Sequence, residues 1–260
     1  MIPHKTILLD IGGTFIKCSD GREIPVASAG SREDIVSSLK QAVGDASLVS
    51  AAVPGPFDYG TGQFLMKHKF AAVYGEYFSD LVGLPRGNCR FGHDVNVMLH
   101  GEMTDGNGKD YRNVALVTLG TGLGFSMAID GKIIKNELGS PAVSIFNIPY
   151  RDGVLEDYVS KRGFLRGYEG ITVKELAQKA HEGDASARAR FAECGTIIAE
   201  VLAPILSEHG IECLLLGGQI SRSSDLFIPA LRSGLGGVAT LRTVTPISDF
   251  DHATFNGLAF

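Results

Sequence analysis

The segment ILLDIGGTFIKCSDGREIPVA, residues 7–27, decides how the rest of the chain is interpreted. Its first apolar run ends at Asp10, after which two glycines and a threonine precede an alternating run that reaches Asp20 and Gly21. Apolar residues on both sides of a glycine turn predict two strands, and the Asp-Gly pair predicts a hairpin into a third. We therefore expect this segment to form three consecutive strands.

The turn between the first two strands has the residue types of a phosphate-binding site. Gly12 and Gly13 can adopt positive φ and leave their N–H groups uncovered, so the backbone can approach an anion closely. Thr14 adds a hydroxyl donor, Lys17 adds a cation, and Asp10 supplies a carboxylate that suits Mg²⁺ or its bound waters. A glycine turn alone is equally consistent with a hairpin that binds nothing, but such a hairpin does not need these polar neighbours.

The same pattern recurs 110 residues later. The segment LVTLGTGLGFSMAIDGKIIK, residues 116–135, predicts another strand, glycine turn, strand and Asp-Gly hairpin. This shift aligns Gly122 with Gly12 and Asp130 with Asp20. A duplicated pattern implies two similar halves, each with a glycine turn. If the halves face each other, the phosphates of a nucleotide would be held between them.

Length and composition predict a soluble protein with two compact domains. The chain has 260 residues, of which 44% are hydrophobic and 20% are charged, as is ordinary for globular proteins. A net charge of −5 argues against a nucleic-acid partner. No apolar run approaches the roughly 18 residues of a membrane span, and no signal sequence is evident, so we expect no membrane association and a cytoplasmic location.

The cysteines favour neither a zinc site nor a disulfide framework. Cys18, Cys89, Cys194 and Cys213 are widely spaced and form no C-x-x-C pair. We expect them to be buried small hydrophobic residues.

Capping signals predict helices between the strands. Ser31 with Asp34, and Thr172 with Glu175, have the spacing of capping boxes, and Asp184 has the position of an N-cap. The apolar stripe of the helix that follows Asp184 would face the core or, equally well, a second copy of the chain in a homodimer. Short apolar runs predict further strands at residues 48–53, 213–216 and 241–245.

The polar, glycine-bearing stretch at residues 104–112 predicts the boundary between the halves. The first domain would span residues 1–107, with a C-terminal helix within residues 246–260 packing back on it. The second domain would span residues 108–245.

Three places outside the glycine turns are candidates for function. The segment at residues 54–70 is rich in Gly and Pro and too polar for a core, so it predicts a functional loop, although a simple connector fits equally well. Asp94 lies between a short strand and a helical pattern, where it can be an N-cap or can take a proton from a substrate hydroxyl. Gly217 and Gly218 predict a strand-to-helix turn, which is either a tight turn without a ligand or one that admits an adenine ring or an α-phosphate.

Five motifs together resemble the ROK family of sugar kinases and repressors, over nearly the whole chain. They are DIGGTFIK (residues 10–17), AVPGPFDYGTG (52–62), HDVNVMLHGE (93–102), LGTGLG (119–124) and LLLGGQIS (214–221). The resemblance implies an α/β fold, namely the two-domain actin-like ATPase (ribonuclease H-like) fold with duplicated mixed sheets and an interdomain cleft. It also implies ATP and Mg²⁺ as cofactors and transfer of the γ-phosphate to a sugar hydroxyl.

The resemblance assigns a role to each motif. Asp94 would deprotonate the hydroxyl, and Asp10 would help to place the magnesium ion through its waters. Pro54, Gly55, His93 and Glu156 would contact the substrate together with Asp94. The phosphates and the nucleotide would be held by Gly12, Gly13, Thr14, Lys17, Gly120, Thr121, Gly122, Gly124, Gly217 and Gly218.

The departures from the family pattern fall on the sugar side. His93 replaces the usual Asn before the catalytic Asp, and Val143 and Phe146 stand where a sugar-binding Glu and a zinc- and sugar-contacting His are usual. The cysteine-rich zinc motif is missing, so we predict no structural zinc, although GVLEDYVS (residues 153–160) matches the tail of that motif and is expected to be helical. A pocket changed in this way cannot make the same hydroxyl contacts.

Three functions are consistent with these residues. The first is a kinase for a sugar or sugar-like polyol that retains its catalytic core. The second is a sugar- or nucleotide-binding regulatory protein with little turnover. The third is an ATPase of the acetate-kinase or actin-like kind, against which the loop at residues 54–62 argues.

Overall fold

The structure is a computed structural model that describes residues 5–259. The chain forms two compact units. The first contains the residues up to Gly101, Lys135–Ala142 and the residues from His252, whereas the second contains Glu102–Ile134 and Val143–Asp251. These limits differ from the predicted boundaries at residues 107 and 245. Residues 1–4 and Phe260, which the predicted first domain includes, lie outside the described residues.

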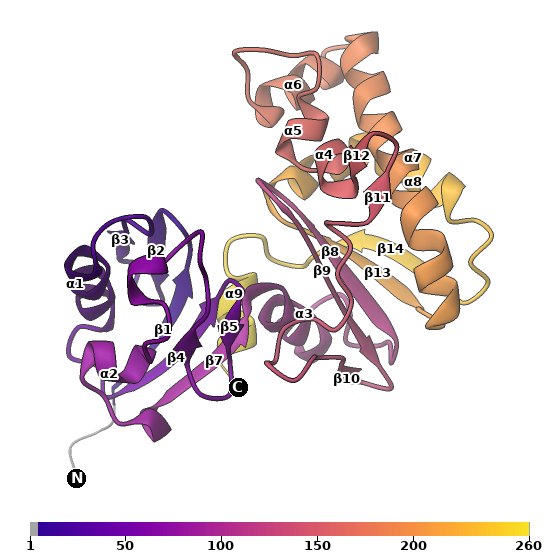
Figure 1. The fold of residues 1–260 in the computed structure, drawn as a ribbon. Helices are drawn as coiled ribbons and strands as arrows, with labels where there is room; N and C mark the ends of the chain where they lie inside the picture. Colours follow the sequence, from indigo (N-terminus) through magenta and orange to yellow (C-terminus); the bar gives the residue numbers. More distant parts are fainter. Residues whose placement is uncertain (1–4, 260) are drawn as a thin grey trace. The chain divides into compact units, whose positions relative to one another are not determined.

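The first unit is built on a five-stranded sheet with the strand order β3-β2-β1-β4-β7 (Figure 1). Strands β1, β2 and β3 are antiparallel neighbours, whereas β4 pairs in parallel with β1 and β7. The predicted capping box at Ser31 is present and begins α1. The elements are β1 (Thr6–Ile11), β2 (Phe15–Cys18), β3 (Glu23–Pro25), α1 (Arg32–Val43), β4 (Leu48–Val53), β5 (Phe57–Asp58), β6 (Gln63–Phe64), α2 (Phe78–Val82), β7 (Cys89–His93), α3 (Asp94–Thr104) and α9 (Ala253–Leu258), with short 3-10 helices at Ala71–Val73 and Arg86–Asn88.

The second unit repeats this arrangement with the strand order β10-β9-β8-β13-β14. Strands β8, β9 and β10 are antiparallel neighbours, and β13 pairs in parallel with β8 and β14. The predicted caps at Thr172 and Asp184 begin α6 and α7. The elements are β8 (Val114–Leu119), β9 (Leu123–Ile129), β10 (Lys132–Ile133), β11 (Pro149–Tyr150), β12 (Gly153–Val154), α4 (Leu155–Val159), α5 (Lys161–Phe164), α6 (Val173–His181), α7 (Ala185–Glu208), β13 (Cys213–Gly217), α8 (Ile228–Gly234) and β14 (Thr243–Pro246), with a 3-10 helix at Gln219–Leu226.

The two sheets have the same topology strand for strand, so the predicted internal repeat is confirmed. The alignment within the repeat is different from the predicted one. The turn after β1 occupies residues 12–14, and the turn after β8 occupies residues 120–122. Gly120 is therefore the counterpart of Gly12, and the predicted match of Gly122 with Gly12 is wrong by two positions. The reason is that the stretch from this turn to the Asp-Gly hairpin is two residues longer in the second copy.

The loop at residues 54–70 is anchored by apolar side chains, contrary to the prediction that it is too polar for the core. Phe57, Phe64, Met66 and Phe70 are each 0% exposed. The ring of Phe57 lies edge-on to that of Phe64, with centroids 5.1 Å apart, and β5 and β6 pair as a short hairpin. These anchors fix the path of the loop, because buried aromatic side chains contribute much of the energy of a small core.

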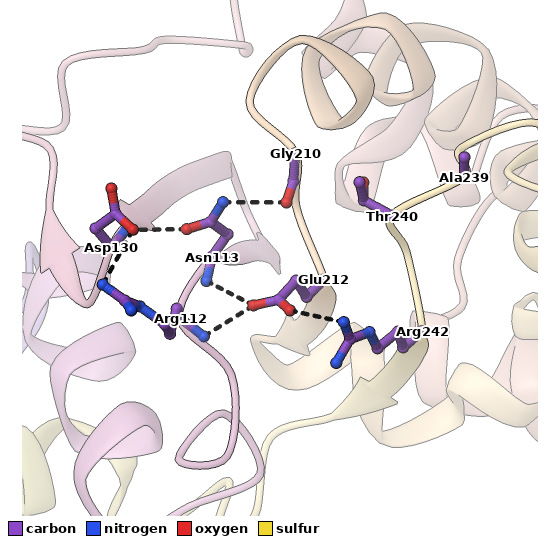
Figure 2. Close-up of a pocket in the computed structure, with 8 residues that line it drawn as sticks. All are labelled: Arg112, Asn113, Asp130, Gly210, Glu212, Ala239, Thr240 and Arg242. Atoms are coloured by element: carbon purple, nitrogen blue, oxygen red, sulfur yellow. Dashed lines mark hydrogen bonds and ion pairs between the residues drawn. The ribbon is translucent and has the colours of Figure 1, made fainter.

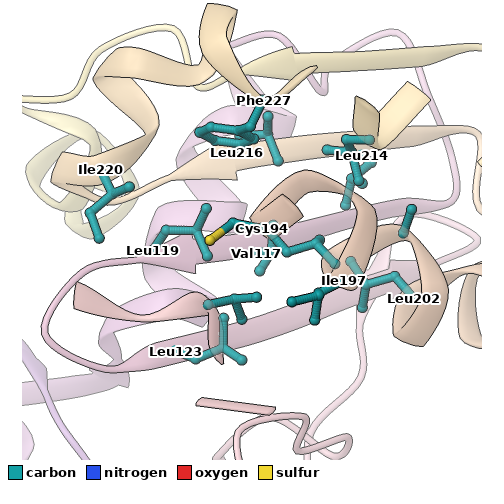
Figure 3. Packing of buried hydrophobic residues seen from close by; sticks show 14 of the residues in the cluster. Val117, Leu119, Leu123, Cys194, Ile197, Leu202, Leu214, Leu216, Ile220 and Phe227 are labelled. Atoms are coloured by element: carbon teal, nitrogen blue, oxygen red, sulfur yellow. The ribbon is translucent and has the colours of Figure 1, made fainter. Parts of the chain in front are cut away.

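The core of the second unit lies between its sheet and α7 (Figure 3). Cys194, Ile197 and Leu202 of α7 are buried against Val117 and Leu216 of the sheet. This packing accounts for the apolar stripe of α7 without a second copy of the chain. Three of the cysteines are buried as predicted, and Cys89 is half-buried. Within residues 5–259, no helix is long and apolar enough to cross a membrane.

A small hairpin of β11 and β12 precedes α4 in the second unit. The Tyr150 and Tyr158 rings meet edge-on with centroids 5.1 Å apart, and the Arg151 guanidinium lies 5.2 Å from the Tyr150 ring. Arg166 covers the Tyr158 ring at 4.4 Å. The predicted helix at residues 153–160 begins only at Leu155, because Gly153 and Val154 pair in this hairpin.

The segment Lys135–Ala142 belongs to the first unit, although it follows the strands of the second. The Tyr59 N–H donates to the Leu138 carbonyl at 2.9 Å, and the Asn96 side-chain amide donates to the Gly139 carbonyl at 3.0 Å. The sequence of this segment has little periodicity, so these long-range hydrogen bonds could not be predicted from it.

We predict that Glu102 is a stabilising residue of the second unit. Its carboxylate is 2% exposed and accepts the N–H groups of Asn107 and Ser248 and the Ser248 hydroxyl at 2.7–2.9 Å. Replacing Glu102 with Ala leaves these donors unpaired and should lower the free energy of unfolding by about 2–4 kcal/mol. Chemical denaturation checks this, with the exposed Glu169→Ala as a control that should match the wild type; equal stability of both variants would contradict the prediction.

Candidate active site

Two carboxylates lie at one edge of the first sheet. Asp10 is near the carboxyl end of β1 and pairs in register with Ala52 of β4, which in turn pairs with Gly92 of β7. Asp94 follows β7 directly. Adjacent strands lie about 4.8 Å apart, so this register brings both aspartates to the same edge, which is where α/β sheets commonly bind ligands.

Asp94 is held by one of its two carboxylate oxygens. The Val95 N–H donates to Oδ1 at 2.8 Å, and His93 Nδ1 lies 2.8 Å from the same atom. A carboxylate cannot donate, so we place the His93 proton on Nδ1. Oδ2 has no hydrogen-bond partner in the described part of the chain. Asp94 thus supports the start of α3 and still offers an acceptor oxygen, so the two roles predicted for it are compatible.

The two aspartates differ in pKa. Burial raises the pKa of Asp10 to about 6, the charge of Asp94 adds to the rise, and Lys17 opposes it. For Asp94, burial acts to raise the pKa, but the hydrogen bond and charge of His93, with the Val95 N–H, outweigh it and lower the pKa below its ordinary value. Asp94 is therefore ionised at neutral pH. Lys17 stands opposite Asp10 in the β1–β2 register, where cross-strand pairs interact.

The first glycine turn leaves backbone donors open. Gly12 and Gly13 do not have the positive φ that their sequence allows. Gly12 is required sterically instead, because a Cβ there would lie 2.9 Å from the Phe15 carbonyl oxygen. The N–H groups of Gly13 and Thr14 have no hydrogen-bond partner within residues 5–259. Such uncovered N–H groups are suited to an anion.

Lys69 is a neighbour of this turn that sequence reasoning missed. A Cβ built on Gly13 would lie 3.3 Å from Lys69 Cε and 3.4 Å from Nζ, so the lysine side chain lies over the turn. The charge of Lys69 also contributes to the lowered pKa of Asp94. No local pattern indicates this placement, because 55 residues separate Lys69 from Gly13.

The predicted substrate residues of the first unit lie together. A Cβ at Gly55 would lie 3.6 Å from both the His93 ring and the Tyr59 hydroxyl. Tyr59, also missed from the sequence, donates its hydroxyl to the Val53 carbonyl at 2.8 Å, and burial raises its pKa. Pro54 lies between Val53 and Gly55 and is half-buried.

The second glycine turn is open on one side. The Gly120 N–H donates to the Gly122 carbonyl at 3.1 Å. A Cβ at Gly120 would meet only the Gly122 oxygen, at 3.9 Å, so packing within the turn does not require glycine at this position. Thr121 is exposed. Gly124 lies in β9 opposite Thr118 and outside the turn.

Glu156 is engaged with the second turn. Its Oε2 accepts the Leu123 N–H at 2.9 Å, and its Oε1 accepts from Arg162 at 3.0 Å. Both carboxylate oxygens therefore have protein partners, and the predicted sugar contact of Glu156 stays a prediction. Val143 packs against the core of the second unit, and Phe146 is exposed.

Gly217 and Gly218 lie at the end of β13, where Gly217 pairs in the sheet and Gly218 packs against the backbone. Gly217 ends β13 opposite Thr118. Gly218 has a φ of +79°, and a Cβ there would lie 2.3 Å from the Leu119 carbonyl oxygen. Close backbone packing thus explains Gly218 without a ligand, and contact with the nucleotide stays a prediction.

A hollow of about 430 Å³ in the second unit is separate from these residues (Figure 2). It lies beside the amino ends of β8, β13 and β14. Glu212 accepts the N–H groups of Arg112 and Asn113 at 3.0 and 3.2 Å and pairs with Arg242 at 3.4 Å. These bonds use the polar groups of the hollow to join strand ends, so we do not assign it to catalysis.

Among the described residues, no group of three or more His, Cys, Asp or Glu side chains could hold a metal ion. Mg²⁺ in nucleotide sites is commonly held by one or two carboxylates together with phosphates and waters. Asp10 therefore remains the candidate for such a contact.

Comparison with known proteins agrees with this architecture. An N-acetylmannosamine kinase from Salmonella paratyphi B is 23% identical over 245 residues, or 83% of each chain. A ROK family glucokinase from Streptomyces griseus, in complex with glucose and AMPPNP, has a TM-score of 0.79 at 24% identity and covers 98% of this chain and 97% of its own. A ROK family transcriptional regulator, a homolog of the E. coli MLC protein, has a TM-score of 0.81 at 16% identity over 98% of this chain and 76% of its own.

These structural matches confirm the predicted actin-like ATPase fold with duplicated mixed sheets. The sequence model of the ROK family matches residues 31–254. Because this match covers most of the sequence, the chain belongs to the ROK family.

Proposed function

We propose that this protein transfers the γ-phosphate of ATP to a hydroxyl group of a sugar or sugar-like polyol. The observation that carries the proposal is the free Oδ2 of Asp94, an ionised carboxylate on the same sheet edge as a glycine turn with open N–H groups. A base beside a phosphate cradle is the arrangement that phosphoryl transfer to an alcohol needs.

Asp94 would act as the general base. His93 and the Val95 N–H fix Oδ1, which leaves Oδ2 to accept the hydrogen bond of the acceptor hydroxyl. The attacking oxygen would give up its proton to Oδ2 as its bond to phosphorus forms. Correct placement of this pair supplies much of the rate enhancement, because phosphoryl transfer depends mainly on positioning and charge neutralisation.

The open backbone groups would bind the phosphates. Gly13, Thr14 and Lys17 supply two N–H groups, a hydroxyl and an ammonium in the first unit. In the second unit, the exposed Thr121 supplies an N–H group and a hydroxyl, whereas the Gly120 N–H is already bonded to the Gly122 carbonyl. Backbone donors are fixed before the reaction, so they stabilise negative charge without rearrangement.

The site fits a magnesium ion at Asp10. The pKa of Asp10 is raised to about 6 by burial and by Asp94, so its negative charge is poorly stabilised by the protein alone. A divalent cation nearby would relieve this. When bound, Mg²⁺ supplies charge neutralisation on the β- and γ-phosphates.

The acceptor should differ from the sugars of typical family members. His93, Val143 and Phe146 replace residues that usually contact sugar hydroxyls, so fewer hydroxyl contacts are available. We therefore keep the acceptor class broad, as a sugar or sugar-like polyol.

A second candidate is a binding or regulatory protein with little turnover. The same three replacements favour it, and the fold also occurs in a ROK family transcriptional regulator. Isothermal titration calorimetry separates the two functions. The regulatory function requires binding of sugar or nucleotide without release of ADP when both are present with Mg²⁺.

We predict that Asp94→Asn abolishes turnover while nucleotide binding persists. Loss of the base should lower kcat by about 10²–10⁴-fold, with little change in the KM for ATP. Coupled ADP release across a panel of sugars with Mg²⁺ measures this, and the exposed Asp80→Asn serves as a matched control. A wild-type protein without turnover on any sugar, or an Asp94→Asn variant with normal turnover, would rule out the kinase function.

We also predict that Asp10 reduces stability at neutral pH. Because its folded pKa is about 6, above its ordinary value of 3.8, its unfavourable contribution is absent near pH 4 and complete above pH 6. Asp10→Asn should therefore raise the free energy of unfolding by about 1–2 kcal/mol near pH 7 and have little effect near pH 4. Thermal unfolding against pH checks this, with the exposed Asp105→Asn as control. A variant less stable than the wild type near pH 7 would contradict it.

A further inference from the structure

Lys69 has a fixed backbone beside the first glycine turn. It lies between Met66 and Phe70, whose side chains are completely buried. The Phe70 N–H donates to the Ser28 carbonyl at 2.6 Å, and the Ser28 hydroxyl donates to the Gly13 carbonyl at 2.6 Å. Ser28 therefore joins the residue after Lys69 directly to the turn. Lys69 reaches Gly13 from a position that the core determines.

The ammonium of Lys69 is free of the usual protein partners. It has no ion pair or hydrogen bond in the part of the chain that the structure describes. It lies instead over Gly13, one residue from the uncovered N–H of Thr14, and close enough to Asp94 to affect it electrostatically. An unpaired cation therefore lies near both the open donors and the carboxylate.

Lys67 provides a contrast within the same loop. Its ammonium lies 5.4 Å from the centroid of the Tyr74 ring, in a cation–π contact on the surface. Tyr74 is half exposed. Of these two lysines, only Lys69 contacts the glycine turn.

We propose that Lys69 binds the γ-phosphate of ATP and stabilises it during transfer. This inference rests on the proposed kinase function and adds a side-chain cation to the backbone donors of the first turn. A lysine ammonium is a common point-charge ligand for phosphate, and its three N–H groups adjust as the phosphoryl group moves.

The position of Lys69 suits the transfer step. The bond between the γ-phosphorus and the bridging oxygen of ADP breaks, and a bond from phosphorus to the acceptor oxygen forms. The acceptor proton moves to Asp94 Oδ2, and ADP leaves with the electron pair of the broken bond. Lys69 stays protonated throughout, so its charge offsets the negative charge on the phosphoryl oxygens between donor and acceptor.

The test compares Lys69→Met and Lys69→Arg with Lys67→Met, a matched control from the same loop. Calorimetry with Mg²⁺ measures the affinity of each full-length variant for ADP and for the non-hydrolysable ATP analogue AMPPNP. Removing a contact to the γ-phosphate should weaken the binding of AMPPNP by about tenfold or more and leave the affinity for ADP unchanged. Lys69→Arg should retain part of the preference for AMPPNP, and Lys67→Met should match the wild type.

Turnover provides the second measurement. With any sugar that the wild type phosphorylates, Lys69→Met should lower kcat by about 100-fold, while Lys67→Met has no effect. Thermal unfolding should be unchanged, since the Lys69 side chain is exposed.

The outcomes separate this inference from the proposed function. If the ratio of the affinities for AMPPNP and ADP is the same in Lys69→Met as in the wild type, Lys69 does not bind the γ-phosphate. This outcome overturns the inference whether or not the wild type is a kinase. If the wild type phosphorylates no sugar but Lys69→Met selectively loses affinity for AMPPNP, the contact between Lys69 and the γ-phosphate is supported. The proposed kinase function then fails. The inference is also overturned if Lys69→Met changes the preference for the acceptor but leaves the ratio of the affinities for AMPPNP and ADP unchanged.

Discussion

Repulsion between Asp10 and Asp94 is the constraint on which the candidate site depends. Parallel pairing of β1, β4 and β7 brings both carboxylates to one sheet edge, and the pKa of Asp10 is raised first by burial and then by the charge of Asp94. The surrounding cations and hydrogen-bond donors offset the repulsion between the two carboxylates. Lys17 faces Asp10 across the strand pair, and His93 with the Val95 N–H stabilises the charge of Asp94. A site with two partly compensated negative charges is prepared for a cation and disfavours a bare anion.

The duplicated topology gives both units the same turn in different surroundings. In the first unit, Ser28 holds the turn and lysine side chains lie beside it. In the second unit, the Glu156 carboxylate holds the start of β9 and is itself paired with Arg162. The repeat thus conserves the strand order, while the backbone hydrogen bond within the turn and the charged side chains differ.

Local signals in the sequence predicted the local structure well. The capping boxes at Ser31 and Thr172 and the strands on either side of each glycine turn are present, because a few adjacent residues determine them. The alignment of the two turns could not be predicted by a single shift, since β9 is longer than β2. The burial of Phe57 and Phe70 was also missed, because irregular spacing in a Gly- and Pro-rich segment hides long-range packing.

The candidate site was predictable to the extent that its residues lie in motifs. Asp10 and Asp94 could be placed at strand ends from the apolar runs before them. Lys69 could not, since only the Ser28 bridge and the buried Phe70 bring it to Gly13. Tyr59 was missed for the same reason: its hydroxyl bonds to a backbone carbonyl that no sequence pattern reveals.

The β11–β12 hairpin has a consequence for the conditions that this protein tolerates. Contacts between tyrosine rings and the guanidinium groups of Arg151 and Arg166 order this stretch. Such contacts depend on guanidinium groups, which keep their positive charge at every physiological pH. The ring–guanidinium contacts of this corner of the second unit therefore persist across the physiological pH range.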